Sequence, residues 1–471
     1  MSSLVRRLGR RGPLTHVRAL HASTSTATPA SSKQATAQLY SSGRQPIALS
    51  SAGITFTLED GRKVLDGMSG GAAVQCLGST NPDVVAVMAK QAAQLPYAWH
   101  QSLGNAPGED LAAWLTARSD GALVAAAFLN SGSEAIDTAI KIVRQYWLEE
   151  GQPQREYIIA RNPSYHGNTL AGLGIGNVAS RRGLYAPYIP DTFQHVTTPQ
   201  LKRSGESEEA YVAQLAKELD DKITALGPQN VAAFLAEPVV GSSVGVMPPP
   251  KGYFPAMAAV CKKHNILFVM DEVMCGTGRS GTLFAYQSVC EGVQPDILTM
   301  AKGLGGGYVT ISGVLVGPRV ADKIIAAGQW KSSQTYQNHP INCAVALSVV
   351  NKIERLLPNV QARGKQCVAE LQEAFKDEPA VYDVRGQGLF IGVEFDVPSD
   401  LSPRFATRVK NRCFDNGLLS LAVSGGVDGT QGEAIVLAPA YNAKEAEIST
   451  MVEILVKSVK ECLAELKKET A

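Results

Sequence analysis

The chain has 471 residues, of which 45% are hydrophobic and 18% charged, and its formal net charge at pH 7 is +1. This is an ordinary globular composition, and the length allows more than one domain. The near-neutral charge gives no reason to expect a nucleic-acid partner, and no apolar run approaches the roughly 18 residues of a membrane-spanning helix. The eight cysteines form no C-x-x-C pair, so we expect neither a disulfide framework nor a metal site.

The N-terminus is rich in arginine and serine and lacks acidic residues. Five arginines precede residue 28, and the first acidic residue is Glu59. Such a start is typical of an organelle transit peptide, and residues 18–23 resemble a cleavage signal of mitochondrial presequences. We therefore predict a transit peptide over residues 1–27 and a location in the mitochondrial matrix. The alternative is a basic tail without a targeting signal, on a cytoplasmic protein.

Short apolar runs alternate with helical stretches in the middle of the chain. The predicted strands are 123–129, 157–160, 231–236, 266–270, 297–300 and 313–316. Residues 133–147 are predicted as a helix because Ile136, Ile140 and Val143 fall on one face. Continuous apolarity fits strands that are covered on both faces, so we predict an α/β fold with a mostly parallel sheet.

The rest of the chain is predicted to form a second, smaller α+β unit. Its elements would be a long helix at 341–376, a strand or hairpin at 389–395 and an amphipathic helix at 443–468. The polar segment 200–209 is predicted as a surface loop before a helix at 210–225. We predict a large domain over residues 91–345 and a small domain that combines residues 46–90 with 346–471.

Two apolar runs are followed by residues that can take part in catalysis. Asp271 follows the run 266–270, and Lys302 follows the run 297–300 and precedes the glycine-rich stretch 303–307. A carboxylate at a buried strand end needs a partner, and a lysine amine there is desolvated and becomes a better nucleophile. Pyridoxal phosphate (PLP) chemistry needs such a pair, because a lysine forms a Schiff base with the cofactor and an aspartate keeps its ring nitrogen protonated. The alternatives are a buried structural aspartate and a surface lysine at a flexible turn.

Three further residues are candidates for binding a phosphate. Gly132 and Ser133 follow the strand 123–129 and open a helix, where backbone N–H groups favour an anion. A plain helix cap with a serine is the alternative. Thr335 lies in a polar, turn-forming segment, and its hydroxyl could reach a phosphate.

Four other candidates follow predicted strands and could contact a cofactor ring. Tyr165 and His166 come after the strand 157–160, and an aromatic side chain there can stack on a ring. Val273 follows the strand 266–270 and could pack against a ring face. Glu237 ends the strand 231–236, where it could orient groups near a cofactor or take part in a structural ion pair.

The stretch 276–281 matches the dinucleotide-binding pattern G-x-G-x-x-G. Only a short, weakly helical segment follows the glycines, and Asp271 and Glu272 precede them, where they would repel a pyrophosphate. An NAD-dependent oxidoreductase is therefore kept only as a distant alternative.

Together these motifs resemble the class III, or omega-type, aminotransferases of PLP fold type I, over about residues 46–465. The resemblance implies a large domain with a mostly parallel seven-stranded sheet, and PLP as the cofactor. It also implies roles for individual residues. Lys302 would be the Schiff-base lysine and proton carrier, and Asp271 would pair with the pyridinium nitrogen.

The resemblance assigns the remaining candidates to the same cofactor. Tyr165 and Val273 would contact opposite faces of the ring. We also expect His166 and Glu237 to be cofactor-binding residues. Gly132 and Ser133 would hold the phosphate. Thr335 would reach the phosphate of the neighbouring subunit, which implies a homodimer with two shared sites.

Two positions depart from the family pattern. Many ornithine- and aminobutyrate-type members carry an arginine that binds the α-carboxylate of 2-oxoglutarate, and a glutamate that gates this arginine. The corresponding positions here are Val436 and Ser242. Because the arginine and the glutamate are both absent, no charge is left without its partner. A monocarboxylate such as pyruvate, or an unusual ketone, is therefore favoured over 2-oxoglutarate as amino acceptor.

The sequence thus predicts a transaminase that moves an amino group from an amino acid or amine to a 2-oxo acid by a ping-pong mechanism. A PLP-dependent decarboxylase or racemase that uses the same site is the main alternative, because Lys302 and Asp271 would serve those reactions too. A non-catalytic scaffold is disfavoured because both residues are present. The identity of the donor is left open.

Overall fold

The computed structural model describes residues 45–469 of the chain. The predicted transit peptide, residues 1–27, lies outside the described residues. The described residues from Ala48 onward belong to one compact unit. No helix in this part of the chain is both long and apolar enough to cross a membrane.

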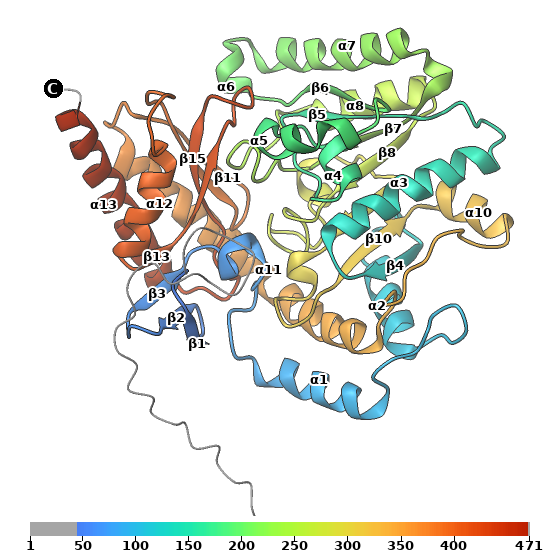
Figure 1. Ribbon diagram of the computed structural model, residues 1–471, viewed down its shortest axis with the longest axis horizontal. Helices are drawn as coiled ribbons and strands as arrows, with labels where there is room; N and C mark the ends of the chain where they lie inside the picture. The colour runs from blue at the N-terminus through green and yellow to red at the C-terminus, as the bar shows by residue number, and fades with distance from the viewer. Residues whose placement is uncertain (1–44, 470–471) are drawn as a thin grey trace, which may run out of the picture. The chain divides into compact units, whose positions relative to one another are not determined.

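A seven-stranded sheet, which we call the central sheet, is the largest sheet of this unit (Figure 1). Its strands, in spatial order, are β4 Ala125–Leu129, β10 Ser312–Val316, β9 Ile297–Met300, β8 Leu267–Asp271, β7 Val231–Ala236, β5 Tyr157–Asn162 and β6 Phe193–Thr197. Within this sheet β10 runs antiparallel to its neighbours β4 and β9, and the other pairs are parallel. The predicted α/β fold with a mostly parallel sheet is confirmed.

Helices cover both faces of the sheet, which explains why its strands are apolar along their whole length. In β7, Phe234 packs on one side with α7 Glu208–Leu226 and α8 Tyr253–Lys263. Its neighbour Leu235 packs on the other side with α3 Gly132–Glu149. Successive side chains of a strand point to opposite faces, so both faces must be apolar.

Two four-stranded sheets lie outside the central one. The first has the order β1 Ala48–Ala52, β2 Thr55–Leu58, β3 Lys63–Asp66, β13 Leu418–Leu419. The second has the order β11 Val381–Gly386, β12 Ile391–Phe395, β15 Glu433–Leu437, β14 Leu421–Ser424. Leu65 pairs with Leu418, so the first sheet joins the two ends of the described chain. The division into a large and a small domain stays a prediction, since all these strands belong to the same compact unit.

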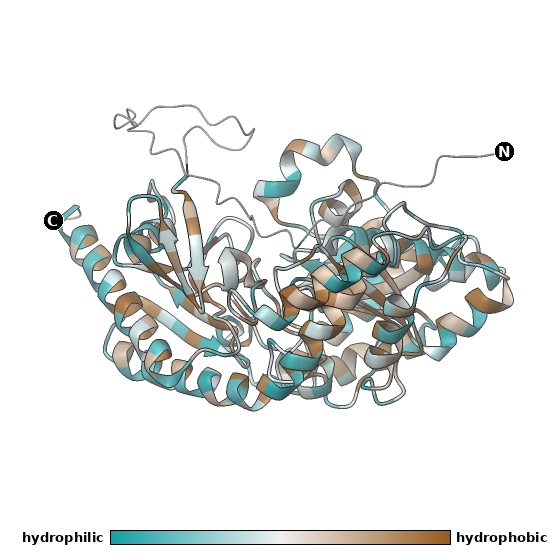
Figure 2. Ribbon diagram, turned by 90° about the horizontal axis from the view of Figure 1, so that it is seen from below, coloured by the Kyte–Doolittle hydropathy of each residue, from teal (hydrophilic) through white to brown (hydrophobic). Residues whose placement is uncertain are grey.

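Three long helices accompany these outer sheets: α11 Pro340–Phe375, α12 Phe405–Asp415 and α13 Glu445–Glu469. In α13, Ile448, Val452 and Leu455 share one buried face, as expected for an amphipathic helix. Figure 2 shows hydrophobic and hydrophilic residues on this helix near the C-terminus.

The remaining elements are short helices and two further helices near the N-terminal end. They are η1 Ser69–Ala73, α1 Pro82–Gln94, α2 Ala106–Thr116, α4 Leu170–Ile175, α5 Ala179–Arg182, η2 Gly183–Tyr188, α6 Leu201–Ser204, η3 Pro228–Asn230, α9 Tyr286–Val289, η4 Lys302–Leu304 and α10 Pro318–Ala326. The prediction of a continuous loop over 200–209 is wrong, because α6 lies within it. Lys202 and Arg203 of this turn form ion pairs with Asp383 and Glu394 of the second outer sheet, contacts that a local sequence pattern does not contain.

Candidate active site

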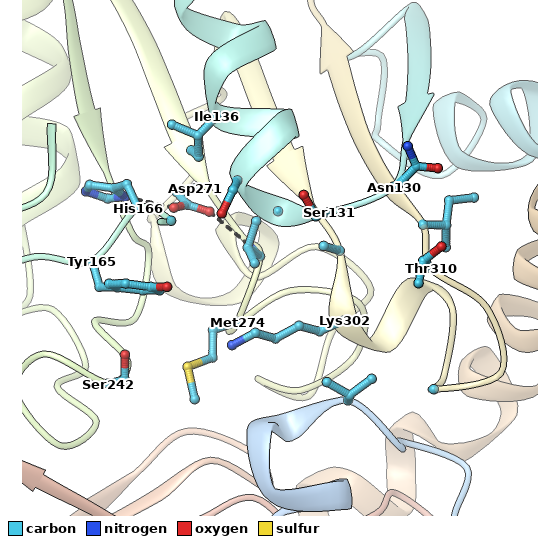
Figure 3. Close-up of a pocket in the computed structure, with 18 of the residues that line it drawn as sticks. Asn130, Ser131, Ile136, Tyr165, His166, Ser242, Asp271, Met274, Lys302 and Thr310 are labelled. Atoms are coloured by element: carbon cyan, nitrogen blue, oxygen red, sulfur yellow. Dashed lines mark hydrogen bonds and ion pairs between the residues drawn. The ribbon is translucent and has the colours of Figure 1, made fainter. Parts of the chain in front are cut away.

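A pocket of about 440 Å³ lies at the carboxyl ends of the central strands (Figure 3). This is where ligands bind in open α/β sheets. Eight of the nine predicted site residues line it: Gly132, Ser133, Tyr165, His166, Glu237, Asp271, Val273 and Lys302. They come from separate strands and loops, which the fold brings together.

Asp271 ends β8 and is 3% exposed. Its Oδ2 lies 2.7 Å from Nδ1 of the buried His166, and its Oδ1 accepts hydrogen bonds from Val273 N and Thr299 Oγ1, each at 3.0 Å. Three partners hold the carboxylate in one orientation at the pocket wall. A carboxylate fixed in this way can accept a hydrogen bond from a protonated ring nitrogen of a ligand.

Lys302 follows β9 and extends its side chain into the pocket (Figure 3). Its backbone has φ 45°, a left-handed conformation that is uncommon for a residue other than glycine. Burial lowers the pKa of its ammonium group to about 8, and the nearby Asp271 and Glu237 carboxylates partly oppose this shift. Lys302 therefore loses its proton more readily than a surface lysine, as a nucleophile or proton carrier requires.

The N-terminus of α3 faces the same pocket. Ser131 caps the helix by accepting a hydrogen bond from Glu134 N at 3.2 Å, and Glu134 returns the contact in a capping box. The cap alternative is thus realised at Ser131, while Gly132 and Ser133 line the pocket. A Cβ on Gly132 would lie 2.7 Å from Val273 Cγ1, so glycine permits this close approach. The backbone N–H groups of an 18-residue helix make this corner suited to an anion.

Tyr165 and Glu237 form other parts of the wall. Tyr165 is half-buried, and its ring lies beside the pocket in Figure 3. Glu237 Oε2 accepts a hydrogen bond from Gly241 N at 2.8 Å, whereas its buried Oε1 has no hydrogen-bond partner among the described residues. Burial raises the pKa of this carboxyl group, and the charges of His166 and Arg161 partly oppose the shift. One carboxyl oxygen is thus left for a ligand.

Thr335 does not line this pocket. It is exposed, and its backbone oxygen accepts a hydrogen bond from Tyr97 Oη at 2.8 Å. Its contact with the phosphate of a neighbouring subunit stays a prediction.

Sequence reasoning also missed several lining residues. Val74, Met274, Thr310 and Ile311 line the pocket. The glycines 303–307 were expected to leave room for a cofactor, but no local pattern predicts that the chain then runs along the pocket to the antiparallel strand β10.

The G-x-G-x-x-G segment forms a series of turns. Glu272, before it, accepts hydrogen bonds from Ala285 N at 2.7 Å and Tyr286 N at 2.8 Å, and the next helix, α9, has four residues. Within the segment, Arg279 is buried and donates to Leu389 O and Pro439 O. This segment lacks the long helix that would hold a pyrophosphate, so the geometry gives the dinucleotide hypothesis no support.

The pocket residues fit PLP by their chemistry. Lys302 offers an amine for the aldehyde, Asp271 a carboxylate for the ring nitrogen, and the start of α3 a site for the phosphate. The buried free oxygen of Glu237 and the close approach of Gly132 to Val273 agree with a wall built for a bulky polar ligand. In the described part of the chain no three metal-ligating side chains gather, so the structure offers no candidate metal site there.

The chain is similar to known aminotransferases in sequence and in structure. The family model for aminotransferase class-III matches residues 41–459. An uncharacterized aminotransferase of Schizosaccharomyces pombe is 39% identical over 90% of this chain and 94% of its own length. A putrescine–pyruvate aminotransferase of Pseudomonas aeruginosa is 30% identical over 88% of this chain and 90% of its own. The crystal structure of an omega transaminase from Pseudomonas jessenii in complex with PMP superposes with a TM-score of 0.82, at 30% identity, over 89% of this chain and 93% of that one.

The chain therefore belongs to the class III aminotransferases, the omega-type branch of PLP fold type I. It is an enzyme, and its cofactor is PLP. The family and cofactor expected from the sequence are confirmed.

Proposed function

We propose that this enzyme transfers an amino group from an amino acid or amine to a pyruvate-like 2-oxo acid by a ping-pong mechanism. The observation that carries this proposal is the joint placement of Lys302, Asp271 and the start of α3 around one pocket. The relative described as a putrescine–pyruvate aminotransferase supports the choice of an amine donor and of pyruvate as acceptor.

Each of these pocket residues would have a separate role in the reaction. When bound, PLP supplies an aldehyde that captures amines and a ring that accepts the electrons of the substrate's Cα–H bond. Lys302 would hold the cofactor, release it to the donor and then move the substrate proton with its freed amine. Asp271, oriented by His166, would keep the ring nitrogen protonated, and Tyr165 and Val273 would hold the ring in place. Gly132 and Ser133 would bind the phosphate.

The preference for a monocarboxylate acceptor follows from the charge of the pocket. Val436 is fully buried in an apolar cluster that includes Ala73 and Phe390, so no cation lies at that position. Ser242 lies in the pocket wall. Lys302 is the one lysine or arginine that lines the pocket in the described structure, and Glu237 and Asp271 are acidic. A second carboxylate on the acceptor would find no cation there.

The proposal includes a homodimer in which Thr335 contributes to the site of the other subunit. Thr335 is exposed beside the exposed aromatic residues Tyr97 and Tyr336, whose rings meet edge to face with centroids 6.2 Å apart. An exposed aromatic cluster is typical of a protein interface.

We also propose that the enzyme is located in the mitochondrial matrix, on the basis of the composition of residues 1–27. Fusing these residues to a fluorescent protein tests whether they direct it to mitochondria.

Visible absorption of the purified enzyme tests the reaction. A donor amine should bleach the yellow colour of bound PLP, and pyruvate should restore it faster than 2-oxoglutarate at equal concentration. The Lys302→Ala variant should lose turnover by roughly 10⁴-fold or more, because it lacks both the attachment point and the proton carrier. The matched control is Lys323→Ala, since Lys323 is a surface residue paired with Glu150. Donor consumption that yields carbon dioxide or the opposite enantiomer, without an amino product from pyruvate, would establish a decarboxylase or racemase instead.

A further inference from the structure

Among the described residues that line the pocket, none offers a free cation to the carboxylate that any amino-acid donor or 2-oxo acid carries. Lys302 is needed for the cofactor, and the other charged groups of the wall, Glu237 and Asp271, are acidic or paired. A carboxylate that enters a largely apolar pocket requires a cationic or hydrogen-bonding partner. A cationic partner would have to come from a residue beside or behind this wall.

Two arginines lie behind the wall, and both are already engaged. Arg161 is 1% exposed and donates to the backbone oxygen of Glu237 at 2.6 Å. Arg279 is 1% exposed, and its Nη1 and Nη2 donate to two backbone oxygens and to Ser69 Oγ. Moving either guanidinium into the pocket would break buried hydrogen bonds, which is costly.

Arg181, which lies against the wall residue Tyr165, is in a different situation. It belongs to the short helix α5 and is exposed, and its guanidinium carbon lies 4.4 Å from the centroid of the Tyr165 ring. Among the described residues it has no carboxylate partner. The ring that it covers is itself part of the pocket wall, next to Ser242 in Figure 3.

The local backbone keeps Arg181 beside this ring. Asn177 N donates to Ser164 O at 3.0 Å, which ties the start of the segment to the residue before Tyr165. Arg182 Nη1 donates to Asn177 Oδ1 at 3.1 Å, which fixes the next residue of α5. Arg181 is thus held at the Tyr165 wall by its neighbours, while its own guanidinium donors stay available.

We propose that Arg181 binds the substrate carboxylate at the Tyr165 side of the pocket and so determines specificity for amino acids and 2-oxo acids. This inference rests on the proposed transaminase function. A guanidinium that stacks on an aromatic ring keeps its in-plane N–H groups free, and these match the two oxygens of a carboxylate. Arg181 would act in substrate binding and would take no part in proton transfer.

The test compares two substrates of the holoenzyme that differ only in the carboxylate: a straight-chain ω-amino acid and the n-alkylamine of the same chain length. Arg181→Met should raise KM for the amino acid and for pyruvate by roughly tenfold to a hundredfold, the range for a lost charge-assisted hydrogen bond. It should leave kcat and the KM of the alkylamine nearly unchanged. Arg181→Lys should give an intermediate KM, because it keeps the charge and loses the planar fork.

Arg62→Met is the matched control, because Arg62 is also exposed and stacked on a ring, at 5.4 Å from that of Phe414, and lies outside the pocket wall. It should change neither substrate's KM. Equal KM changes for both substrates in Arg181→Met, or no change in either, would overturn the inference.

Calorimetric titration separates this inference from the proposed function. Pentanoate, an unreactive carboxylate, should bind wild-type holoenzyme at least tenfold more tightly than Arg181→Met, whereas pentanamide should bind both alike. If the wild-type enzyme aminates no acceptor at all, the proposed function fails while the titration still decides the role of Arg181. If transamination proceeds and pentanoate binds both proteins equally, only the Arg181 assignment fails.

Discussion

Lys302 occupies an unusual combination of surroundings for a lysine. Its backbone is left-handed, it follows a buried strand, and burial lowers the pKa of its ammonium group to about 8. The carboxylates nearby prevent a larger drop. The amine is therefore poised between its two protonation states near physiological pH, as a group that must both attack an aldehyde and carry a proton requires.

This lowered pKa predicts how PLP uptake depends on pH. The rate of covalent uptake by the apoprotein should rise with pH and level off above about 8, because only the neutral Lys302 amine attacks the aldehyde. Stopped-flow absorbance measures this rate, with Lys302→Ala as the variant that takes up no PLP covalently. A rate that keeps rising to the ordinary lysine value of 10.5 would contradict the lowered pKa.

The same shift has a consequence for stability, with a definite sign. Between about pH 8 and 10.5 the unfolded chain holds the Lys302 proton and the folded apoprotein does not. The unfolded state then binds more protons, so the contribution of this group to the free energy of unfolding increases with pH across that window.

His166 and Asp271 form a buried pair beside Lys302, and burial makes the contact between them important. The two side chains are 1% and 3% exposed, and 2.7 Å separates Nδ1 from Oδ2. His166→Phe should lower the free energy of unfolding of the apoprotein by about 1.5–3 kcal/mol, since the buried carboxylate loses a charge-assisted hydrogen bond. Urea denaturation measures the change. His166→Asn, which keeps a donor, should lose less, and equal stability of His166→Phe and wild type would show that the pair contributes nothing.

At the scale of elements, the sequence predicted those parts of the fold whose pattern is local. The strands 231–236 and 297–300 match β7 and β9 residue for residue, because their unbroken apolar runs reflect burial on both faces. Strand β6 was missed, since this edge strand includes the polar Gln194 and His195 and has no such run. The turn α6 was missed because ion pairs to distant strands stabilise it.

The same distinction between local patterns and long-range packing explains which site residues could be predicted from the sequence. Residues that follow buried strands, such as Asp271, Lys302 and Glu237, could be found because the ends of neighbouring parallel strands meet at one edge of a sheet. Val74 and Thr310 could not, because they reach the pocket through segments whose paths depend on packing between distant parts of the chain. Arg181 is likewise visible only once Tyr165 is placed beneath it.

The N-terminus of α3 yields a prediction at this scale. Gly132→Ala should weaken PLP binding and lower the free energy of unfolding by roughly 1–3 kcal/mol, because the new methyl group would lie 2.7 Å from Val273 Cγ1 and force helix and wall apart. Gly104→Ala is the control, since a Cβ there meets nothing within 4 Å. PLP affinity by fluorescence titration and urea denaturation test both effects. If the two variants behave alike, the close approach of α3 to Val273 has no role in the site.

At the scale of the whole molecule, the assignment of Thr335 decides whether one chain can form a complete site. In the described chain Thr335 is exposed and lies outside the pocket wall, although it is predicted to contact a phosphate. Thr335 can lie outside this pocket wall and still contact a phosphate only if the phosphate belongs to the site of a second subunit. A symmetric dimer satisfies this twice, because each copy then gives to its partner what it receives.

Heterodimers in which each subunit carries a different substitution can separate a contact within one subunit from a contact between subunits. Lys302→Ala and Thr335→Asp should each inactivate the homodimer, the first by removing the amine and the second by placing a negative charge beside the phosphate. If Thr335 acts across the interface, a heterodimer of the two variants contains one site with both defects and one site with neither. Co-expression with two different tags and tandem purification yields this heterodimer, which should show about half of the wild-type activity per dimer. If Thr335 acts within its own subunit, each site of the heterodimer keeps one defect and the activity stays absent, which would overturn the shared-site arrangement while leaving the roles of Lys302 and Asp271 intact.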